Sequence, residues 1–295
     1  MNIKLLGIAA GRGGAKSGAE DGPFALRQHG LVERLAADGA DIEDLGDIPG
    51  VYETRFARGF PASMNFLPNI LQVNRHTHAC VLGTRRKSPG AFLLVIGGDH
   101  SLAIGVLAGL SDSCARLGLI WIDAHPDFNT PRSTPSGNIH GMSLAVACGL
   151  AHPSLRGIAD RDPLVAKEDV VLLGCRDIDV GEKRALESSR MSLMMADQWR
   201  ANGITDTLVQ VARSLSQRCD HVHLSLDIDV LDPRYVPGTG TPVADGLTPD
   251  ELRSALAALA SEQLVHSAEI VEYNPKLDEN GRTAAVTIDL ITALV

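Results

Sequence analysis

The sequence predicts an α/β fold: a single three-layer α/β/α domain spanning residues 1–295, with a mainly parallel central sheet. Short runs rich in Val, Ile and Leu alternate with helical segments, and most are apolar at every position, as in parallel strands covered on both faces. No Ser/Gly-rich linker, charge block or internal repeat divides the chain, and α/β folds of this length commonly form one unit. The expected strands are Lys4–Ile8, Phe92–Ile96, Leu119–Ile122, Val170–Leu173, His221–Leu226 and Ala268–Val271.

Three segments between these strands carry the apolar spacing of helices. Two of them are Pro23–Ala37 and Asp206–Arg218. The third has the clearest start, because Thr248 is followed by Pro at the first helical position and by Glu three residues on. This capping-box pattern predicts a helix that runs through Ala260.

The composition fits a globular protein and argues against several kinds of partner. Hydrophobic residues make up 44% of the chain, ample for a buried core, and the net charge of −9 argues against nucleic acid. No apolar stretch approaches the ~18 residues of a membrane span, and Met1–Ala10 lacks a signal-peptide cleavage site. Five scattered cysteines without a C-x-x-C pair indicate reduced thiols. We therefore expect a cytoplasmic protein without disulfides or membrane contact.

A glycine-rich turn after the first strand does not match a nucleotide-binding motif. The segment Gly11–Ser17 reads Gly-Arg-Gly-Gly-Ala-Lys-Ser. Ala15 stands where a phosphate-binding loop requires Gly before Lys-Ser, and Lys16 stands where the dinucleotide fingerprint requires Gly. The G-x-S-x-G motif of serine hydrolases is also missing from the sequence. We interpret the glycines as a flexible turn.

Metal-binding residue types gather where three of the expected strands end. Phe92–Ile96 runs into Gly-Gly-Asp-His-Ser, Leu119–Ile122 into Asp-Ala-His-Pro-Asp, and His221–Leu226 into Asp-Ile-Asp. Ligands of open parallel sheets bind beyond the carboxyl ends of the strands, so these side chains should meet at one rim. The candidate ligands are His100, Asp123, His125, Asp127, Asp227 and Asp229.

Each of these residues alone has a plainer interpretation. An Asp that closes a strand often caps the next helix, and a His there is usually only hydrogen-bonded. The six residues together call for a different interpretation, because four carboxylates at one place repel one another unless a cation neutralises them. Oxygen-rich ligation with two imidazoles suits Mn²⁺, and six ligands suffice for two ions. The residues therefore predict a dinuclear metal hydrolase.

Three blocks resemble the signature blocks of the ureohydrolase family, and most closely those of its arginase branch. They are Gly97–Ser101 (Gly-Gly-Asp-His-Ser), Asp123–Asp127 (Asp-Ala-His-Pro-Asp) and Ser225–Pro233 (Ser-Leu-Asp-Ile-Asp-Val-Leu-Asp-Pro). The likeness runs from the N-terminal strand past Glu272, which is nearly the whole chain.

This resemblance implies a reaction and a ligand assignment. We expect two Mn²⁺ per chain, hydrolysis of the guanidinium group of L-arginine to urea and L-ornithine, and a homo-oligomer, a trimer or hexamer. In the implied assignment, His100 and Asp127 bind one ion, His125 and Asp229 bind the other, and Asp123 and Asp227 bridge both.

The resemblance also implies which residues handle the substrate. Asn129 and Ser136 would contact the α-carboxylate, and Asp179 and Glu182 would face the α-ammonium group. The implied catalytic residues are His140 for proton transfer, Asp127 for holding a proton and Glu272 for orienting the guanidinium, with Thr241 lining the same pocket.

Plainer roles remain open for some of these positions. They are a turn former for Asn129, the first-turn acid of a helix for Glu182 and a strand-end charge for Glu272.

Other functions remain open beside this one. An agmatinase or guanidinobutyrase would hydrolyse a substrate that lacks one or both polar groups of the amino-acid end, whereas the loop from Asn129 to His140 favours a substrate that has them. A non-catalytic arginine-binding relative would not need a full ligand set. A zinc deacetylase of related fold fits less well, because both metal positions look complete.

Overall fold

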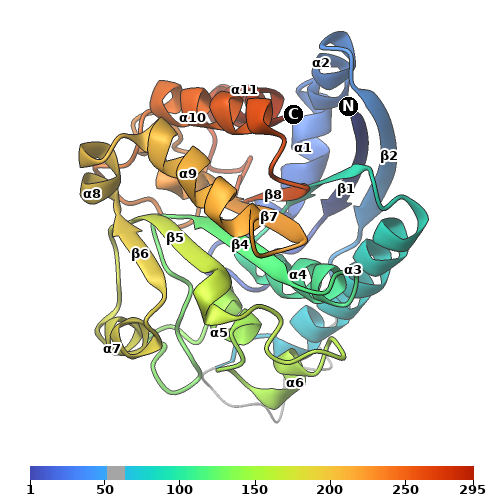
Figure 1. The fold of residues 1–295 in the computed structure, drawn as a ribbon. Helices are drawn as coiled ribbons and strands as arrows, with labels where there is room; N and C mark the ends of the chain where they lie inside the picture. Colours follow the sequence, from blue (N-terminus) through green and yellow to red (C-terminus); the bar gives the residue numbers. More distant parts are fainter. Residues whose placement is uncertain (52–63) are drawn as a thin grey trace.

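The computed structural model describes residues 1–51 and 64–295, and an eight-stranded sheet runs through its centre (Figure 1). Every pair of neighbouring strands is parallel, so the predicted α/β class is confirmed and the sheet is more uniform than the mainly parallel one expected. All six predicted strands are present. In sheet order the strands are β2 (Asp41–Ile48), β1 (Asn2–Ile8), β3 (Phe92–Gly97), β8 (Ser267–Val271), β7 (His221–Asp227), β4 (Leu117–Ile122), β5 (Val170–Cys175) and β6 (Ser192–Met195).

The two strands that the sequence did not predict, β2 and β6, form the edges of the sheet. Most residues of β2 are exposed, and β6 has only four residues, none of them fully buried. A strand at an edge needs no continuous apolar run, because solvent reaches it. The hydrophobic signal that marks the central strands is therefore weak in both.

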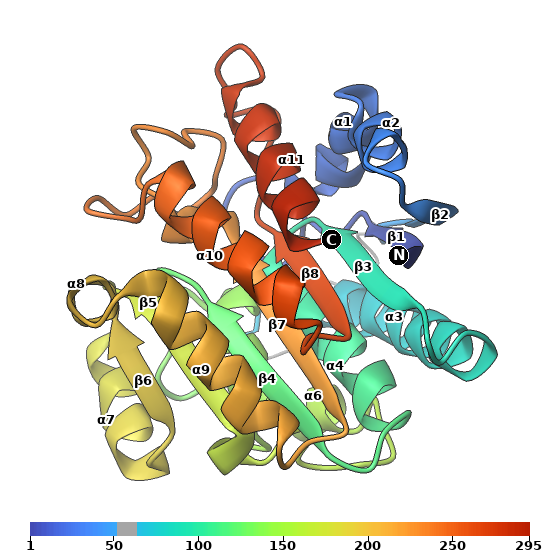
Figure 2. The same cartoon turned by 45° about the horizontal axis from the view of Figure 1, so that its top comes forward.

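Helices cover both faces of the sheet (Figure 2). One buried apolar cluster joins one face to α3–α7, and a second joins the other face to α1, α2 and α8–α11. The helices are α1 (Gly22–Gln28), α2 (Leu31–Ala37), α3 (Leu67–Lys87), α4 (Ala103–Ser111), α5 (Ser143–Ala147), α6 (Pro153–Arg156), α7 (Val180–Ser189), α8 (Ala196–Ala201), α9 (Ile204–Ser216), α10 (Pro249–Glu262) and α11 (Arg282–Leu294), with 3₁₀ turns η1 (Ala19–Asp21), η3 (His100–Leu102), η4 (His140–Met142), η5 (Lys167–Asp169) and η6 (Ile228–Val230).

The predicted helix Pro23–Ala37 was wrong in one respect, because the structure divides it into α1 and α2. Gly30 adopts φ 86°, a left-handed conformation that ends the first helix and redirects the chain. The other two predicted helices, now α9 and α10, are confirmed. Thr248 caps α10 as expected, with its Oγ1 accepting a 3.2 Å hydrogen bond from the backbone N–H of Glu251.

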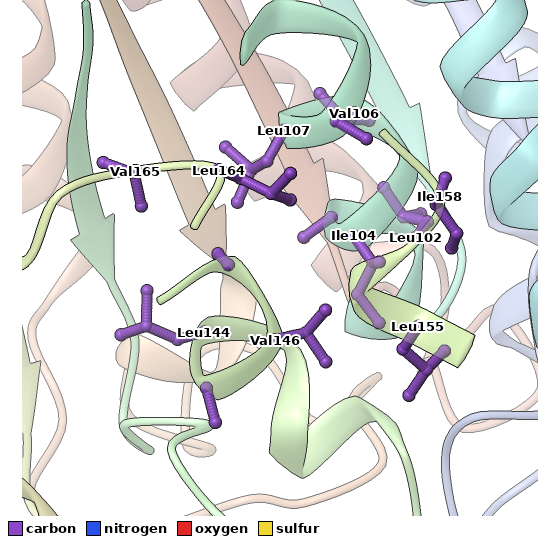
Figure 3. Close-up of a cluster of buried hydrophobic side chains, with 14 of the residues drawn as sticks. Leu102, Ile104, Val106, Leu107, Leu144, Val146, Leu155, Ile158, Leu164 and Val165 are labelled. Carbon is purple, nitrogen blue, oxygen red and sulfur yellow. The ribbon is translucent and has the colours of Figure 1, made fainter. Parts of the chain in front are cut away.

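The core under the sheet fixes two turns that carry histidines. All nine residues of α4 are buried, and Figure 3 shows its Ile104, Val106 and Leu107 packed near Leu144 and Val146 of α5. The turn η3 leads directly into α4, and η4 leads into α5. Dense packing of both helices therefore holds the two turns in place.

The structure also bears on the cysteines and on membrane contact. All five cysteine thiols are free. Within residues 1–51 and 64–295, no helix combines the length and the apolar character needed to cross a bilayer.

Candidate active site

The carboxyl ends of β3, β4 and β7 bring the six sequence-predicted ligands together at one rim. Five of them form two groups whose ligand atoms lie within 4.8 Å of one another. The first, which we call the inner group, contains His100, Asp123 and Asp227, and the second, the outer group, contains Asp123, His125 and Asp229. Asp123 belongs to both groups, whereas Asp227 belongs to the inner group alone.

The same local device shapes all three strand ends. An Asp carboxylate accepts a hydrogen bond from the backbone N–H two residues on: Asp99 from Ser101 at 3.0 Å, Asp123 from His125 at 2.7 Å, and Asp227 from Asp229 at 2.8 Å. Such Asx turns let the chain leave a strand sharply and satisfy a backbone donor that the sheet no longer serves. In Asp123 and Asp227 the second carboxylate oxygen lies close to His100 Nδ1.

The inner group surrounds one nitrogen of His100. Its Nδ1 lies 3.1 Å from Asp123 Oδ2, 3.1 Å from Asp127 Oδ2 and 3.4 Å from Asp227 Oδ2. The imidazole is completely buried and stacks on the Trp121 ring, with ring centres 4.1 Å apart. Packing and three carboxylates thus fix the position of this ring.

The outer group is more open to solvent. His125 Nδ1 lies 3.1 Å from Asp229 Oδ2 and 3.5 Å from Asp123 Oδ1, and the His125 side chain is 24% exposed. Its Nε2 lies 3.9 Å from a carboxylate oxygen of Asp177, which is itself exposed. Thr241 closes the other side by donating a 3.0 Å hydrogen bond from Oγ1 to Asp229 Oδ2.

The electrostatics of the inner group fit a cation. His100 Nδ1 is buried and makes no hydrogen bond within the described residues, although three carboxylate oxygens face it. Burial, followed by the charges of Asp229 and Asp123, raises the pKa of Asp227 well above its usual range. Burial and the charge of Asp123 raise the pKa of Asp127 to about 6. Such crowding of carboxylates around a bare nitrogen suits a hard or borderline divalent ion.

Two candidate site residues have an unfavourable backbone conformation. Asp127 adopts φ 49° and Glu272 adopts φ 66°, both in the left-handed region. A non-glycine residue held there costs on the order of 1–3 kcal/mol, and such strain collects at functional sites. The strain is consistent with a functional role for both carboxylates.

The partly exposed His140 pairs with the buried Glu272 beside the inner group. His140 Nδ1 lies 3.0 Å from Glu272 Oε1, and the same oxygen accepts a 2.8 Å hydrogen bond from the backbone N–H of His100. Burial lowers the pKa of His140, but the Glu272 carboxylate outweighs burial and raises it to about 9. His140 in turn holds the pKa of Glu272 below its usual value, against the effect of burial.

A pocket opens over the rim and collects most of the sequence-predicted substrate residues. Glu272 is not among its lining residues, because it is buried behind His140. Of the residues singled out from the sequence, the pocket is lined by His125, Asp127, Asn129, Ser136, His140, Asp179, Glu182, Asp227 and Thr241. It is also lined by Thr134, Gly141 and Asp177, which the sequence reasoning missed. For Asp177 a signal was present, since it stands two residues before Asp179.

Glu182 serves the local structure as well as lining the pocket. Its carboxylate accepts hydrogen bonds from the backbone N–H of Phe128 at 2.6 Å and of Asp179 at 3.2 Å, the latter as part of the cap of α7. Burial raises the pKa of Glu182 to about 8. Asp179 is more available, and Asn129 Nδ2 donates a 2.8 Å hydrogen bond to its Oδ2.

Arg176 is a further residue that the sequence reasoning missed. Its guanidinium donates to the backbone carbonyl oxygens of Asp229 at 2.8 Å, Val243 at 2.8 Å and Ala244 at 2.9 Å. These bonds fasten the segment that follows β7 and carries Asp229 and Thr241. Nothing in the local sequence separates this role from that of an ordinary surface arginine.

The structure thus has two candidate metal positions that share a carboxylate. They lie at the carboxyl-terminal rim of a parallel sheet, under a polar pocket. This arrangement is that of a metal-dependent α/β hydrolase. Comparison with known proteins gives the family. The sequence model of the Arginase family matches residues 1–295, and the chain belongs to this family, which is metal-dependent.

Individual relatives agree with the family match. The chain is similar to the arginase of Bacillus caldovelox, with 42% identity over 99% of this chain and 97% of the relative, and to the arginase of Bacillus subtilis, with 39% identity over the same shares. The solved structure of the Bacillus caldovelox arginase has a TM-score of 0.94 at 41% identity, covering 99% of this chain and 97% of that one. The predicted family resemblance and fold are therefore confirmed.

Proposed function

We propose that this chain binds two Mn²⁺ ions at the rim and hydrolyses the guanidinium group of L-arginine to urea and L-ornithine. The observation that carries the proposal is the pair of ligand groups joined by Asp123 beneath a pocket lined with polar groups. Relatives named arginase, 36–42% identical over nearly the whole chain, support the substrate.

The proposed metal assignment follows the geometry of the rim. His100, Asp123, Asp127 and Asp227 would hold the inner ion, and Asp123, His125 and Asp229 the outer one. When bound, the ions would offset the carboxylate charge and make water nucleophilic at neutral pH. The set is rich in oxygen and lacks thiolates, a donor combination that suits Mn²⁺.

The chain's own groups would handle the protons. A guanidinium resists hydrolysis because resonance makes its carbon electron-rich, so the departing nitrogen must be protonated. His140 lines the pocket, and its pKa of about 9 keeps it protonated at neutral pH, so it would donate a proton to that nitrogen. Asp127, which lines the same pocket, would hold the proton released by the attacking water on a carboxylate oxygen.

The pocket would recognise the substrate at both ends. Asn129 and Ser136 would bind the α-carboxylate, and Asp179, aided by Glu182, would bind the α-ammonium group. Glu272, behind His140, would help to orient the guanidinium. Thr241 would keep the pocket wall in register with Asp229 through its hydrogen bond.

We also propose a cytoplasmic homo-oligomer, a trimer or hexamer. Five free thiols are consistent with a reducing compartment, and the assembly rests on the family resemblance. Sedimentation of the purified chain would test the assembly.

Urea release from a panel of guanidino compounds, after preincubation with Mn²⁺, tests the proposed reaction. L-Arginine should be the best substrate, ahead of agmatine and 4-guanidinobutyrate, which lack the α-carboxylate or the α-ammonium group. A higher kcat/KM for either analogue would replace the arginine assignment with that of a related guanidino hydrolase. Release of urea from none of them would favour a non-catalytic relative.

A further inference from the structure

A column of polar side chains runs through the apolar core directly below the inner group. Residues alternate along β7, so His221, His223 and Ser225 share one face, and Ser267 and Glu269 of β8 lie beside the last two in parallel register. All five side chains are at most 3% exposed. Their register neighbours on β3 and β4 are Leu, Val or Trp. Polar groups at such depth are costly unless they are hydrogen-bonded, so the column calls for an explanation.

The upper part of the column reaches the metal position through a chain of hydrogen bonds. Ser225 Oγ donates a 2.7 Å hydrogen bond to Glu269 Oε1 and lies 2.8 Å from His100 Nε2. A serine hydroxyl has one proton. Because Ser225 gives that proton to the carboxylate, it can only accept from His100, whose Nε2 must then carry hydrogen. The other ring nitrogen, Nδ1, is left to present its lone pair to the inner group.

In the lower part of the column, Ser267 bridges two histidines. Ser267 Oγ lies 2.7 Å from His221 Nε2 and 2.8 Å from His223 Nδ1, so it accepts from one ring and donates to the other. If it donates to His223, the Nε2 of His223 carries hydrogen and faces Glu269 Oε2 at 3.7 Å. That distance is too long for a hydrogen bond but favourable for a polar N–H beside a carboxylate. Glu269 is then the one group of the column that only accepts, and donors face it from both sides.

We infer that Glu269 is a positioning residue for metal binding, a role that rests on the proposed function. By accepting the Ser225 proton, Glu269 makes Ser225 an acceptor and keeps the lone pair of His100 Nδ1 directed at the ion. Metal-binding histidines usually donate their second N–H to a carboxylate or carbonyl group, which fixes the ring and its tautomer. In this chain a serine stands between the histidine and its carboxylate.

Three variants of the full chain test the inference, each stripped of metal and titrated with Mn²⁺ alone. Glu269→Leu removes the acceptor, so Ser225 can turn its proton toward His100 Nε2, and Mn²⁺ binding at the inner position should weaken about 10- to 100-fold. Glu269→Gln keeps an amide oxygen that accepts from Ser225, so its affinity should stay close to that of the unchanged chain. Ser267→Ala is the matched control, because it disturbs the same buried column on the same strand without touching Ser225.

A second readout separates positioning from damage to the fold. Excess Mn²⁺ should restore the kcat of Glu269→Leu, because the defect lies in metal affinity. A kcat that stays low at saturating Mn²⁺, with both ions bound, would overturn the inference. Unchanged affinity in Glu269→Leu, equal loss in Glu269→Leu and Glu269→Gln, or equal loss in Ser267→Ala would each overturn it as well. If the unchanged chain binds no Mn²⁺, the proposed function itself fails, so the two failures are distinguishable.

Discussion

The inner group and the outer group share Asp123, but they differ in how deeply their histidines are buried. The inner histidine, His100, is completely buried, stacked on Trp121 and backed by Ser225. The outer histidine, His125, has a side chain that is 24% exposed and lines the pocket. Burial slows the exchange of ligands with solvent, whereas an open position can meet a substrate. We therefore expect the inner ion to be the tightly held one and the outer ion to be the exchangeable one.

The largest effect should come from removing the residue that the two groups share. Asp123→Ala should lose both ions and reduce urea release to the level of chelator-treated protein, because each ion loses the carboxylate that the two positions share, leaving three of four proposed ligands at the inner position and two of three at the outer one. Elemental analysis of the purified variant measures this directly. Asp227→Ala, in contrast, should lose mainly the inner ion. Asp177→Ala is the control, since it removes an exposed carboxylate 3.9 Å from His125 that belongs to neither group. An Asp123 variant that keeps either ion would contradict the shared role.

A smaller loss should follow from changing the pocket without changing the metals. His140→Asn should lower kcat by about 10²–10⁴-fold, the usual contribution of a general acid or base. Both ions should remain, because His140 contacts Glu272 and belongs to neither ligand group. Steady-state kinetics and metal content, measured on one preparation, give both values. An unchanged kcat between pH 7 and 10 would return His140 to a structural role in the loop.

Discrimination between arginine and its analogues should depend on the pocket residues proposed to bind the amino-acid end of the substrate. Losing one buried charged contact costs on the order of 2–5 kcal/mol, so arginine should exceed agmatine in kcat/KM by roughly 30- to 5,000-fold. Asp179→Ala should lower the use of arginine by part of that factor, mostly through a higher KM, because the ammonium contact exists in the ground and transition states alike. An equal loss of kcat/KM for arginine and for 4-guanidinobutyrate, which lacks the ammonium group, would contradict this role of Asp179.

The smallest effect concerns the stability of the metal-free protein. Because the pKa of His140 rises from 6.5 to about 9 on folding, its pairing with Glu272 stabilises the fold fully below about pH 6.5 and is lost as the pH rises through about 9. The pKa of Glu272 is lowered, so its share is lost only in acid, as the pH falls below 4.5 toward the folded value. Chemical unfolding at several pH values should show that His140→Asn removes a decline on the order of 3 kcal/mol between pH 6.5 and 9. If the free energy of unfolding has the same pH dependence in His140→Asn and in the unchanged chain, the pairing of His140 with Glu272 does not stabilise the fold.

The metal-ligand residues could be predicted from the sequence more easily than the residues that hold them in position. Ligands such as His125 and Asp229 directly follow apolar strands, so the end of a strand and the residue type together revealed them. Arg176 and Glu269 act through backbone carbonyls or through another side chain, and such contacts depend on segments far apart in the chain. Glu269 also stands inside a predicted strand, and a single charged residue between apolar ones does not indicate from the sequence whether its side chain is buried.

The elements that the sequence missed have equally local reasons. The edge strands β2 and β6 lack the buried run that marks the others, and a single left-handed glycine divides α1 from α2. The bridging role that the family resemblance implies for Asp227 stays a prediction, because the structure places this residue with His100 and Asp123 in the inner group and not in the outer group.

Stepwise metal loading shows most directly whether the chain has two unequal metal positions that are both needed for activity. Metal-stripped protein would be titrated with Mn²⁺ while bound metal and urea release from L-arginine are followed in the same samples. We expect two equivalents per chain, one bound more tightly than the other, with full activity only after the second has bound. Saturation at one equivalent, or full urea release before any Mn²⁺ is added, would contradict it.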